Sequence, residues 1–308
     1  MSTMLFYHAA CLRHDTGLGH PERPDRLRAV MHRLEAEEFA HLDRRDAPRA
    51  SRQQLLRVHD PDYIAGILQA EPQDGHVFLD GDTLMSPGST EAALRAAGAV
   101  CAAVDAVVSG EGRNAFCAVR PPGHHAEPER AMGFCLFNNI AIGAMHARTV
   151  HNLRRIAVVD FDVHHGNGTQ ASFASDPDLL YASTHQWPLY PGTGHPRERG
   201  LGNIFNLTLE PEAGSREFHA VVERELVPAL DAFRPELLLV SAGFDGHRAD
   251  PLAELNLTEE DYGWVTAQLC TVANRHAKGR LVSALEGGYD LNALANAAAA
   301  HVRALMVN

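Results

Sequence analysis

Short apolar runs alternate with longer amphipathic segments along the chain. Four runs have the length and composition of strands that are covered on both faces: 115–119, 156–159, 237–240 and 281–285. Apolar residues at helical spacing, together with start and stop residues such as Pro24 and Gly110, predict helices over 23–39, 89–109, 214–233 (kinked at Pro228), 258–278 and the alanine-rich end of the chain. This alternation predicts an α/β fold, in which helices cover both faces of a mostly parallel sheet.

Polar residues of catalytic type follow each of these four strands. His124 and His125 follow the first, the segment 160–165 follows the second, Asp245 follows the third and Tyr289 follows the fourth. Ligands of open parallel sheets bind outside the carboxyl ends of the strands. We therefore expect these side chains to meet at one edge of the sheet and to form one site.

The segment Val158–Thr169, VVDFDVHHGNGT, places carboxylates and imidazoles at the end of a buried strand. Taken alone, it also fits an acidic turn that caps a helix. Asp162 and His164 share one strand parity with Asp160, so we expect their side chains to leave on one side, whereas His165 has the other parity and is predicted to be structural. Asp162, His164 and Asp245 make a set of three ligands with one open position, which is typical of catalytic zinc.

Two adjacent histidines, His124 and His125, are candidates for both the general base and the general acid of an amide hydrolysis. Asp160 and Asn167 follow the neighbouring strand and are available to orient the two imidazoles. Because one partner is charged and the other is neutral, we expect the two histidines to differ in basicity. Tyr289, which follows a glycine pair, is the candidate donor to the oxyanion.

The amino-acid composition limits the classes of partner that we expect. The 308 residues contain 27 Lys and Arg against 39 Asp and Glu, a net charge of -12, which argues against a nucleic-acid partner and permits a cationic substrate. Five dispersed cysteines without a C-x-x-C pair favour a reducing cytoplasmic location. No run of 18 apolar residues occurs, so we expect no membrane partner. A homo-oligomer is compatible with all of these features.

Six motifs, RPPGHH, GFCLFNN, DFDVHHGNGT, YPGTG, AGFD and LEGGY, occur in this order between about residues 5 and 305. The set closely resembles the zinc-dependent histone deacetylase family, including its bacterial histone deacetylase-like amidohydrolases and acetylpolyamine amidohydrolases. Asn167 and the LEGGY motif look like the class II pattern. The resemblance implies the arginase/deacetylase fold, with a central eight-stranded parallel sheet, in a single catalytic domain over residues 1–308.

The resemblance also implies roles for individual residues. Asp162, His164 and Asp245 match the family's zinc ligands, His124 and His125 match its tandem histidines, and Tyr289 matches its transition-state tyrosine, while Asp160 and Asn167 are the partners of the histidines. A structural potassium ion is implied near Asp160, Asp162, His164 and Ser183. Four residues match the substrate channel or its rim: Gly133, Phe134, Tyr190 and Leu252.

Two of these channel residues bear on the substrate. Tyr190 stands where many relatives carry Phe, and its hydroxyl could bond to a substrate, so the acyl-chain preference stays open. Leu252 stands where a polyamine-selective relative carries Glu. We therefore expect a hydrolase that removes acetyl or related acyl groups from lysine side chains or similar amines, with zinc-activated water, and we keep an acetylpolyamine or other small-amide hydrolase as the alternative.

Two further readings remain. The same fold resembles that of arginase, a two-manganese ureohydrolase. Arginase has a D-x-H-x-D motif, and this chain has Gly166 in place of the second Asp in Asp162-Val163-His164-His165-Gly166. One metal ion is therefore expected. A non-catalytic module that binds acyl-lysine or a polyamine is the other alternative, and the presence of all the expected ligands and of Tyr289 argues against it.

Overall fold

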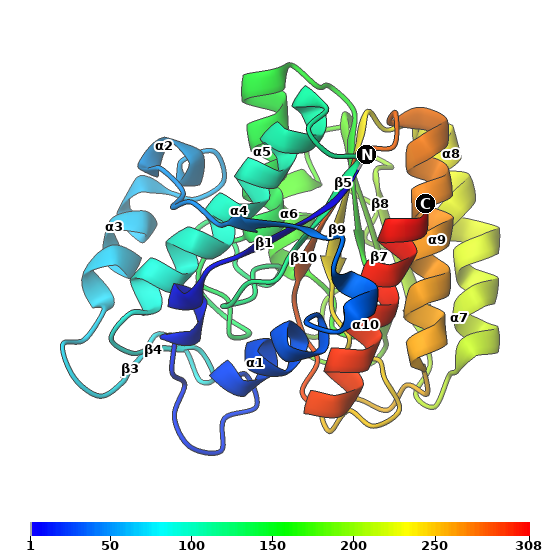
Figure 1. The fold of residues 1–308 in the computed structure, drawn as a ribbon. Coiled ribbons are helices and arrows are strands. Elements are labelled where there is room, and N and C mark those ends of the chain that lie inside the picture. The colour runs from blue at the N-terminus through cyan, green and yellow to red at the C-terminus, as the bar shows by residue number, and fades with distance from the viewer. Residues whose placement is uncertain (1) are drawn as a thin grey trace.

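A single sheet of eight parallel strands forms the centre of the computed structural model, which describes residues 2–308 (Figure 1). The spatial order is β2-β1-β5-β10-β9-β6-β7-β8. The strands span Thr3–Tyr7 (β1), Asp43–Asp46 (β2), Asn114–Cys117 (β5), Ile156–Asp160 (β6), Leu179–Gln186 (β7), Ile204–Leu209 (β8), Leu237–Ala242 (β9) and Leu281–Leu285 (β10). A separate antiparallel hairpin pairs Val77–Phe78 (β3) with Leu84–Met85 (β4). The predicted α/β fold with a central eight-stranded parallel sheet is confirmed.

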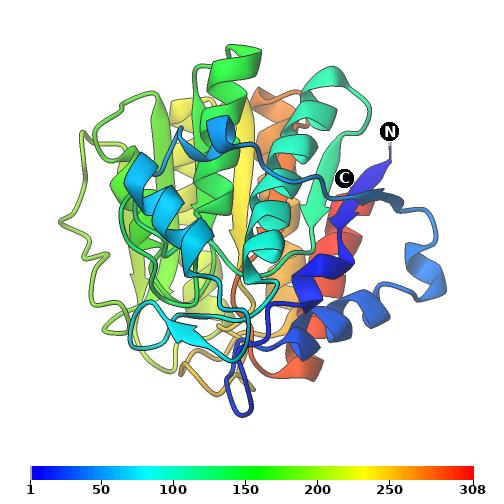
Figure 2. The same cartoon turned by 90° about the vertical axis from the view of Figure 1, so that its left-hand side faces the viewer.

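Helices cover both faces of the sheet. Figures 1 and 2 show α4 and α5 on one face and α9 and α10 on the other, where α7 and α8 lie outside α9. The helices span Pro24–Arg33 (α1), Arg52–Leu55 (α2), Pro61–Ala70 (α3), Ser89–Ser109 (α4), Asn139–His151 (α5), Asn167–Phe173 (α6), Ser215–Val221 (α7), Val227–Phe233 (α8), Glu259–His276 (α9) and Leu291–Val307 (α10). Short 3-10 turns lie at Ala9–Leu12 (η1) and Glu37–Phe39 (η2).

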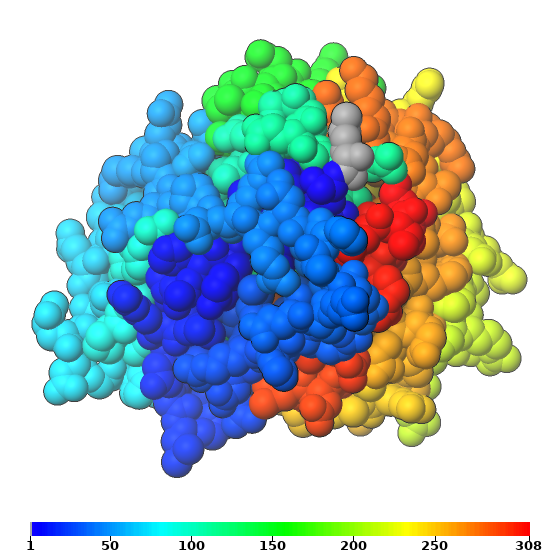
Figure 3. Space-filling model, viewed as in Figure 1, coloured from blue at the N-terminus to red at the C-terminus, as the bar shows by residue number. Residues whose placement is uncertain are grey.

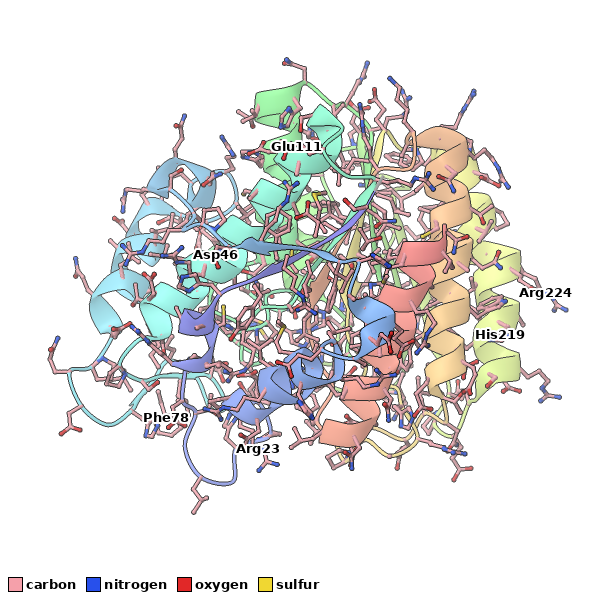
Figure 4. The ribbon with its side chains drawn as sticks, viewed as in Figure 1. Arg23, Asp46, Phe78, Glu111, His219 and Arg224 are labelled. Atoms are coloured by element: carbon pink, nitrogen blue, oxygen red, sulfur yellow. The ribbon has the colours of Figure 1, made fainter. Side chains whose placement is uncertain are left out.

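The four strands that the sequence predicts to end in catalytic groups are direct neighbours, in the order β5-β10-β9-β6 at the centre of the sheet. Their carboxyl ends point toward the lower side of Figure 1. Figure 4 labels Arg23, which precedes α1, and Phe78 of the β3–β4 hairpin at that side, and Glu111 at the opposite side. The topology therefore brings the predicted catalytic segments together at one edge.

Two predicted helices differ in the structure. The helix predicted over 23–39 ends at Arg33, because Ala36 is extended and turns the chain into η2. The helix predicted over 214–233 is interrupted by a π-helical turn at Val222–Leu226 (η3), after which α8 begins with Pro228 in its first turn. Pro228 has no backbone N–H to donate, so the regular α-helical hydrogen-bond pattern cannot continue through it. The π-helical turn lies directly before this break.

The strand β6 ends at Asp160, before the two residues that the sequence predicts to be metal ligands. The expectation that strand parity alone aligns Asp160, Asp162 and His164 is therefore wrong beyond Asp160. Backbone-to-side-chain hydrogen bonds in the following turn place the other two residues instead.

The helix α4 is the one helix among residues 2–308 that is long and apolar enough to cross a membrane, yet 67% of its most apolar window is buried within the protein. It packs so closely that a Cβ at Gly98 would lie 2.0 Å from the backbone oxygen of Pro48. This is the packing of a core helix. On the opposite side of the sheet α1 packs against α10, and Figure 3 shows the blue N-terminal segments beside the red C-terminal helix.

Candidate active site

The turn after β6 is built by successive backbone hydrogen bonds to carboxylates. The Asp162 N–H donates to Asp160 Oδ1 at 3.1 Å, and the His164 N–H donates to Asp162 Oδ1 at 2.9 Å. From the loop after β9, Asp245 Oδ1 accepts the N–H of Val163 at 2.9 Å. These bonds lock two loops together and bring Asp162, His164 and Asp245 to one point.

The three predicted metal ligands form a compact buried cluster. His164 Nδ1 lies 3.2 Å from Asp162 Oδ1 and 3.1 Å from Asp245 Oδ2, and the three donor atoms all lie within 4.8 Å of one another. Asp162 is 1% exposed and Asp245 is fully buried. Within the described chain neither carboxylate forms an ion pair with a Lys or Arg. Buried carboxylates of this kind are normally paired or bound to a metal, so the donor set fits a divalent cation such as zinc.

Two glycines leave room for this cluster. A Cβ at Gly243 would lie 2.0 Å from Asp162 Oδ2, and a Cβ at Gly287 would lie 2.0 Å from Asp245 Oδ2. Real Cβ atoms do not approach oxygen this closely, so any side chain at either position would displace a carboxylate. The carboxylate positions therefore depend on both glycines.

The tandem histidines each bond to the predicted partner. His124 Nδ1 lies 2.9 Å from Asp160 Oδ2, and His125 Nδ1 lies 2.8 Å from Asn167 Oδ1. The two rings are adjacent, with centroids 4.0 Å apart. Each Nδ1 is thus occupied, which leaves each Nε2 for chemistry.

The environments drive the pKa values of the two histidines apart. Burial lowers the pKa of His124, but the charges of Asp160 and Asp162 outweigh it and raise that pKa well above its usual value. Burial, followed by the charges of His124 and His164, holds the pKa of His125 well below its usual value. One imidazole is therefore charged and the other neutral, the pattern that separates an acid from a base.

A cavity of about 220 Å³ leads to these groups. Its lining contains the predicted channel residues Gly133, Phe134, Tyr190 and Leu252, the catalytic candidates His125 and Tyr289, the predicted metal ligand His164, and also Asp82 and Leu189. The Tyr190 ring lies edge-on to His125, with centroids 5.2 Å apart, and the Phe134 ring lies edge-on to Tyr289 at 5.9 Å. Aromatic walls thus lead from the rim to the histidines and the tyrosine.

Comparison with known proteins agrees with this geometry. A profile of the Histone deacetylase domain matches residues 20–305. The chain belongs to the histone deacetylase family. It is 39% identical over 312 residues to the histone deacetylase-like amidohydrolase of Pseudomonas aeruginosa and 38% identical over 298 residues to a probable deacetylase of Archaeoglobus fulgidus. Each alignment covers 94% of this chain and 82% of the relative.

A solved structure supports the same assignment for the fold. The crystal structure of the HDA15 HD domain superposes with a TM-score of 0.93 at 31% sequence identity, over 100% of this chain and 89% of that one. The predicted family and fold are confirmed, and this deacetylase-family chain is a hydrolase that acts on amides. The family is generally zinc-dependent, which agrees with the Asp162, His164 and Asp245 cluster.

Sequence reasoning missed Arg26, a fully buried residue of α1 in this histone deacetylase-family chain. Its Nε donates to the carbonyl of Gly288 at 2.5 Å and its Nη2 to the carbonyl of Glu286 at 2.5 Å. Its guanidinium carbon lies 4.8 Å from the centre of the Tyr289 ring, and Glu22 balances its charge at 2.8 Å. The sequence offered one indication of this role, which is that Arg26 is a charged residue next to the apolar positions of the predicted helix.

Glu286 is a second missed residue. Its Oε2 accepts the N–H groups of Gly123 at 2.6 Å and His124 at 3.2 Å, and its Oε1 accepts the hydroxyl of Ser241 at 3.2 Å. Burial raises the pKa of Glu286 to about 7. The carboxyl group therefore ties the segment that carries the tandem histidines to β9 and β10. An acidic residue between a buried strand and a glycine pair was the available signal.

The remaining predicted residues lie around the end of β6. Ser183 of β7 is in register with Asp160, so the residues predicted to surround potassium are adjacent. His165 points away from the metal cluster, and its ring nitrogens lie 2.8 Å from Thr193 Oγ1 and 2.9 Å from Gln170 Oε1. Burial, then the charge of His185, lowers the pKa of His165 to about 3. The structural role of His165 stays a prediction, with which these contacts agree.

A second group, Asp105, His146 and His151, also has metal-like donor spacing, on α4 and α5. Both histidines direct Nε2 at Asp105 Oδ1, at 2.7 and 2.6 Å. Arg57 Nη1 donates to Nδ1 of His146 at 2.6 Å, so the ring proton of His146 sits on Nε2 and donates to Asp105. That nitrogen has no lone pair to offer to a cation, and we interpret this group as a hydrogen-bonded link between helices.

Proposed function

We propose that this chain removes acetyl or related acyl groups from the amide nitrogen of lysine side chains or similar amines, with one zinc ion held by Asp162, His164 and Asp245. The observation that carries the proposal is the convergence of these residues with His125 and Tyr289 at one narrow cavity. Bound there, zinc would supply a Lewis acid for the carbonyl and lower the pKa of a water molecule.

The histidines would move the protons. His125 is neutral and lines the cavity, so it is placed to take a proton from the attacking water and to return it to the departing amine. His124 lies behind it and stays charged beside Asp160, where it balances the carboxylates. Asn167 holds the Nδ1 side of His125, so that Nε2 remains the reactive nitrogen.

Tyr289 would stabilise the oxyanion. Desolvation raises the pKa of Tyr289 well above its usual value, so the hydroxyl keeps its proton and can donate it in a hydrogen bond. The rings of Phe134 and Tyr190 would pack along the methylene stem of an acylated lysine and exclude water from it. This division of labour requires a slender, apolar substrate stem that ends in an amide.

We further propose a structural potassium ion near Asp160, Asp162, His164 and Ser183, with backbone oxygens of the first three residues as most of its ligands. The adjacent positions of Asp160 and Ser183 on β6 and β7 support this assignment. A cation there would offset the buried carboxylate of Asp160.

An acetylated polyamine is the second candidate substrate, because the cavity mouth carries a carboxylate. Asp82 Oδ1 accepts the Thr83 hydroxyl at 2.8 Å and the Gly133 N–H at 3.2 Å, while Oδ2 has no hydrogen-bond partner in residues 2–308. A free ammonium group on the substrate would find its counter-charge there. Leu252, on the same cavity, offers no charge, and we therefore place acyl-lysine first.

A comparison of kcat/KM on an acetyl-lysine peptide and a monoacetylated diamine, in wild type and Asp82→Asn, tests this order. We expect the peptide to be preferred, and Asp82→Asn to reduce turnover of the diamine more than that of the peptide. A higher kcat/KM on the diamine would reverse the order. No hydrolysis of either amide by the zinc-loaded protein would overturn the proposed function.

A further inference from the structure

We propose that Asp250 is a positioning residue that fixes Tyr289 and the channel wall relative to each other; this inference rests on the function proposed above. Asp250 lies in the loop after Asp245 and is 8% exposed. Its Oδ2 accepts the backbone N–H of Tyr289 at 2.7 Å. Its Oδ1 accepts the backbone N–H of Leu252 at 3.0 Å. One carboxylate thus holds the predicted oxyanion donor and a residue that lines the substrate cavity.

The segment that carries Tyr289 depends on such bonds, because a glycine pair precedes it. The Gly287 N–H donates to Asp162 Oδ2 at 2.8 Å, and the Gly288 carbonyl accepts from Arg26 at 2.5 Å. Gly288 has a φ of +121°, a conformation that favours glycine and adds no side-chain restraint. The bond to Asp250 is the one hydrogen bond of the Tyr289 N–H among the described residues. Asp250 is therefore the anchor at the tyrosine end of the turn.

Loss of this anchor has a specific consequence. Without Asp250, the Tyr289 N–H would lose its acceptor, and the turn would be free to move the phenol relative to the metal cluster. A displacement of about 1 Å in a reacting group can cost roughly 100-fold in rate. The substrate stem would still meet Phe134 and Tyr190, so substrate binding should change less than turnover.

A double-mutant cycle tests the inference, with Asp250→Ala and Tyr289→Phe made alone and together in the full zinc-loaded chain. We expect Asp250→Ala to lower kcat by roughly 10- to 100-fold, with KM changed by less than about threefold. Tyr289→Phe should lower kcat by roughly 10²- to 10³-fold. Because Asp250 acts through Tyr289, the double variant should match Tyr289→Phe to within about twofold.

Two further variants control the cycle. Asp290→Asn is the matched control for Asp250→Asn, because it changes a carboxylate to an amide in the residue next to Tyr289. The Asp290 side chain accepts the N–H groups of Asn292 and Ala293 at the start of α10, so kcat of this variant should stay within about twofold of wild type. Asp250→Asn keeps one acceptor oxygen and should recover part of the activity lost in Asp250→Ala. If the alanine variant does not fold, Asp250→Asn replaces it in the cycle.

Three results would overturn the positioning role: losses in kcat that multiply in the double variant, an effect of Asp250→Ala on KM alone, or wild-type kcat in both Asp250 variants. Failure of the proposed function looks different, because the zinc-loaded wild type itself would then hydrolyse no acylated amine. Zinc content and thermal unfolding of each variant separate a shifted tyrosine from a lost metal site.

Discussion

At the scale of single residues, the partners of the buried ionisable side chains distinguish one site from another. Glu22 is fully buried between Arg26 and Arg120; burial alone would raise its pKa, but the two arginines lower it to about 2. Among residues 2–308, Asp162 and Asp245 pair with no arginine, which agrees with the cation site proposed there. A buried carboxylate normally needs a paired charge or a metal, and Glu22 has the paired charge.

His301 gives a prediction about acid stability. It is fully buried in α10, with Nδ1 at 2.7 Å from Thr266 Oγ1 and Nε2 at 2.8 Å from Ser283 Oγ, and burial lowers its pKa to about 3. The unfolded chain binds a proton at this residue below about pH 6.5, whereas the folded chain does not until about pH 3. Stability from this residue is therefore present at pH 7 and lost as the pH falls.

Urea unfolding of wild type and His301→Leu at pH 7 and pH 5 measures this contribution. Relative to the variant, wild type should lose about 2 kcal/mol in free energy of unfolding between the two pH values. Thr266 and Ser283 still donate to the backbone oxygens of Tyr262 and Ala115, so the variant should fold. A difference between the two proteins that does not change with pH would contradict the buried, neutral histidine.

The site residues that the sequence predicted are those that stand close together in motifs. Asp162, His164 and the tandem histidines stand in dense motifs directly after apolar runs, so the sequence predicted that they meet. Arg26 and Asp250 are single charged residues that lie far in sequence from the groups they hold, at Gly288 and Tyr289. These contacts form only when loops distant in sequence pack together at the sheet edge. A local sequence pattern therefore does not predict them.

At the scale of elements, the order of the central strands creates the site. The strands β5, β10, β9 and β6 are neighbours, so the loops that follow them pack against each other. The glycine pair after β10 reaches into the metal cluster, where Gly287 N donates to Asp162 Oδ2. The backbone of the loop after β10 therefore contributes to the site, in addition to the catalytic side chains.

Substitution of Gly287 tests that closeness. A Cβ there would lie 2.0 Å from Asp245 Oδ2 and 2.6 Å from Asp162 Oδ2, so Gly287→Ala should weaken zinc binding by roughly 10- to 100-fold or more in a chelator competition. Gly66→Ala in α3 is the matched control, since among residues 2–308 no atom outside the surrounding helix backbone lies within 4 Å of its Cβ. It should keep zinc affinity and gain about 0.5–1 kcal/mol in stability. Equal zinc affinity in the two variants would contradict the geometry.

Hydrophobic runs predicted the four central strands but not the outer ones. The edge strand β2 has the sequence DRRD, and β7 has LLYASTHQ, which turns polar halfway. β2 lies at the edge of the sheet and alternates half-buried with exposed residues, so it needs no apolar run. β7 lies inside the sheet and is fully buried, but its polar second half conceals it from a search for apolar runs. The number of eight strands came from the family resemblance alone.

At the scale of the whole molecule, the sheet edge, the cavity and the rim loops act together. The 220 Å³ cavity is lined by His125, by Tyr289 and by His164, one of the three predicted metal ligands. Membership in the histone deacetylase family confirms hydrolysis of amides as the chemistry. We propose that this hydrolysis requires one zinc ion at Asp162, His164 and Asp245.

Titration of the metal-free protein with zinc, while the release of acetate from an acetyl-lysine peptide is followed, tests this claim most directly. We expect no acetate release without metal and full activity at one equivalent of zinc per chain. At the same zinc concentration, Asp245→Ala should bind no zinc. Activity that requires two equivalents of manganese, or that persists without metal, would contradict it.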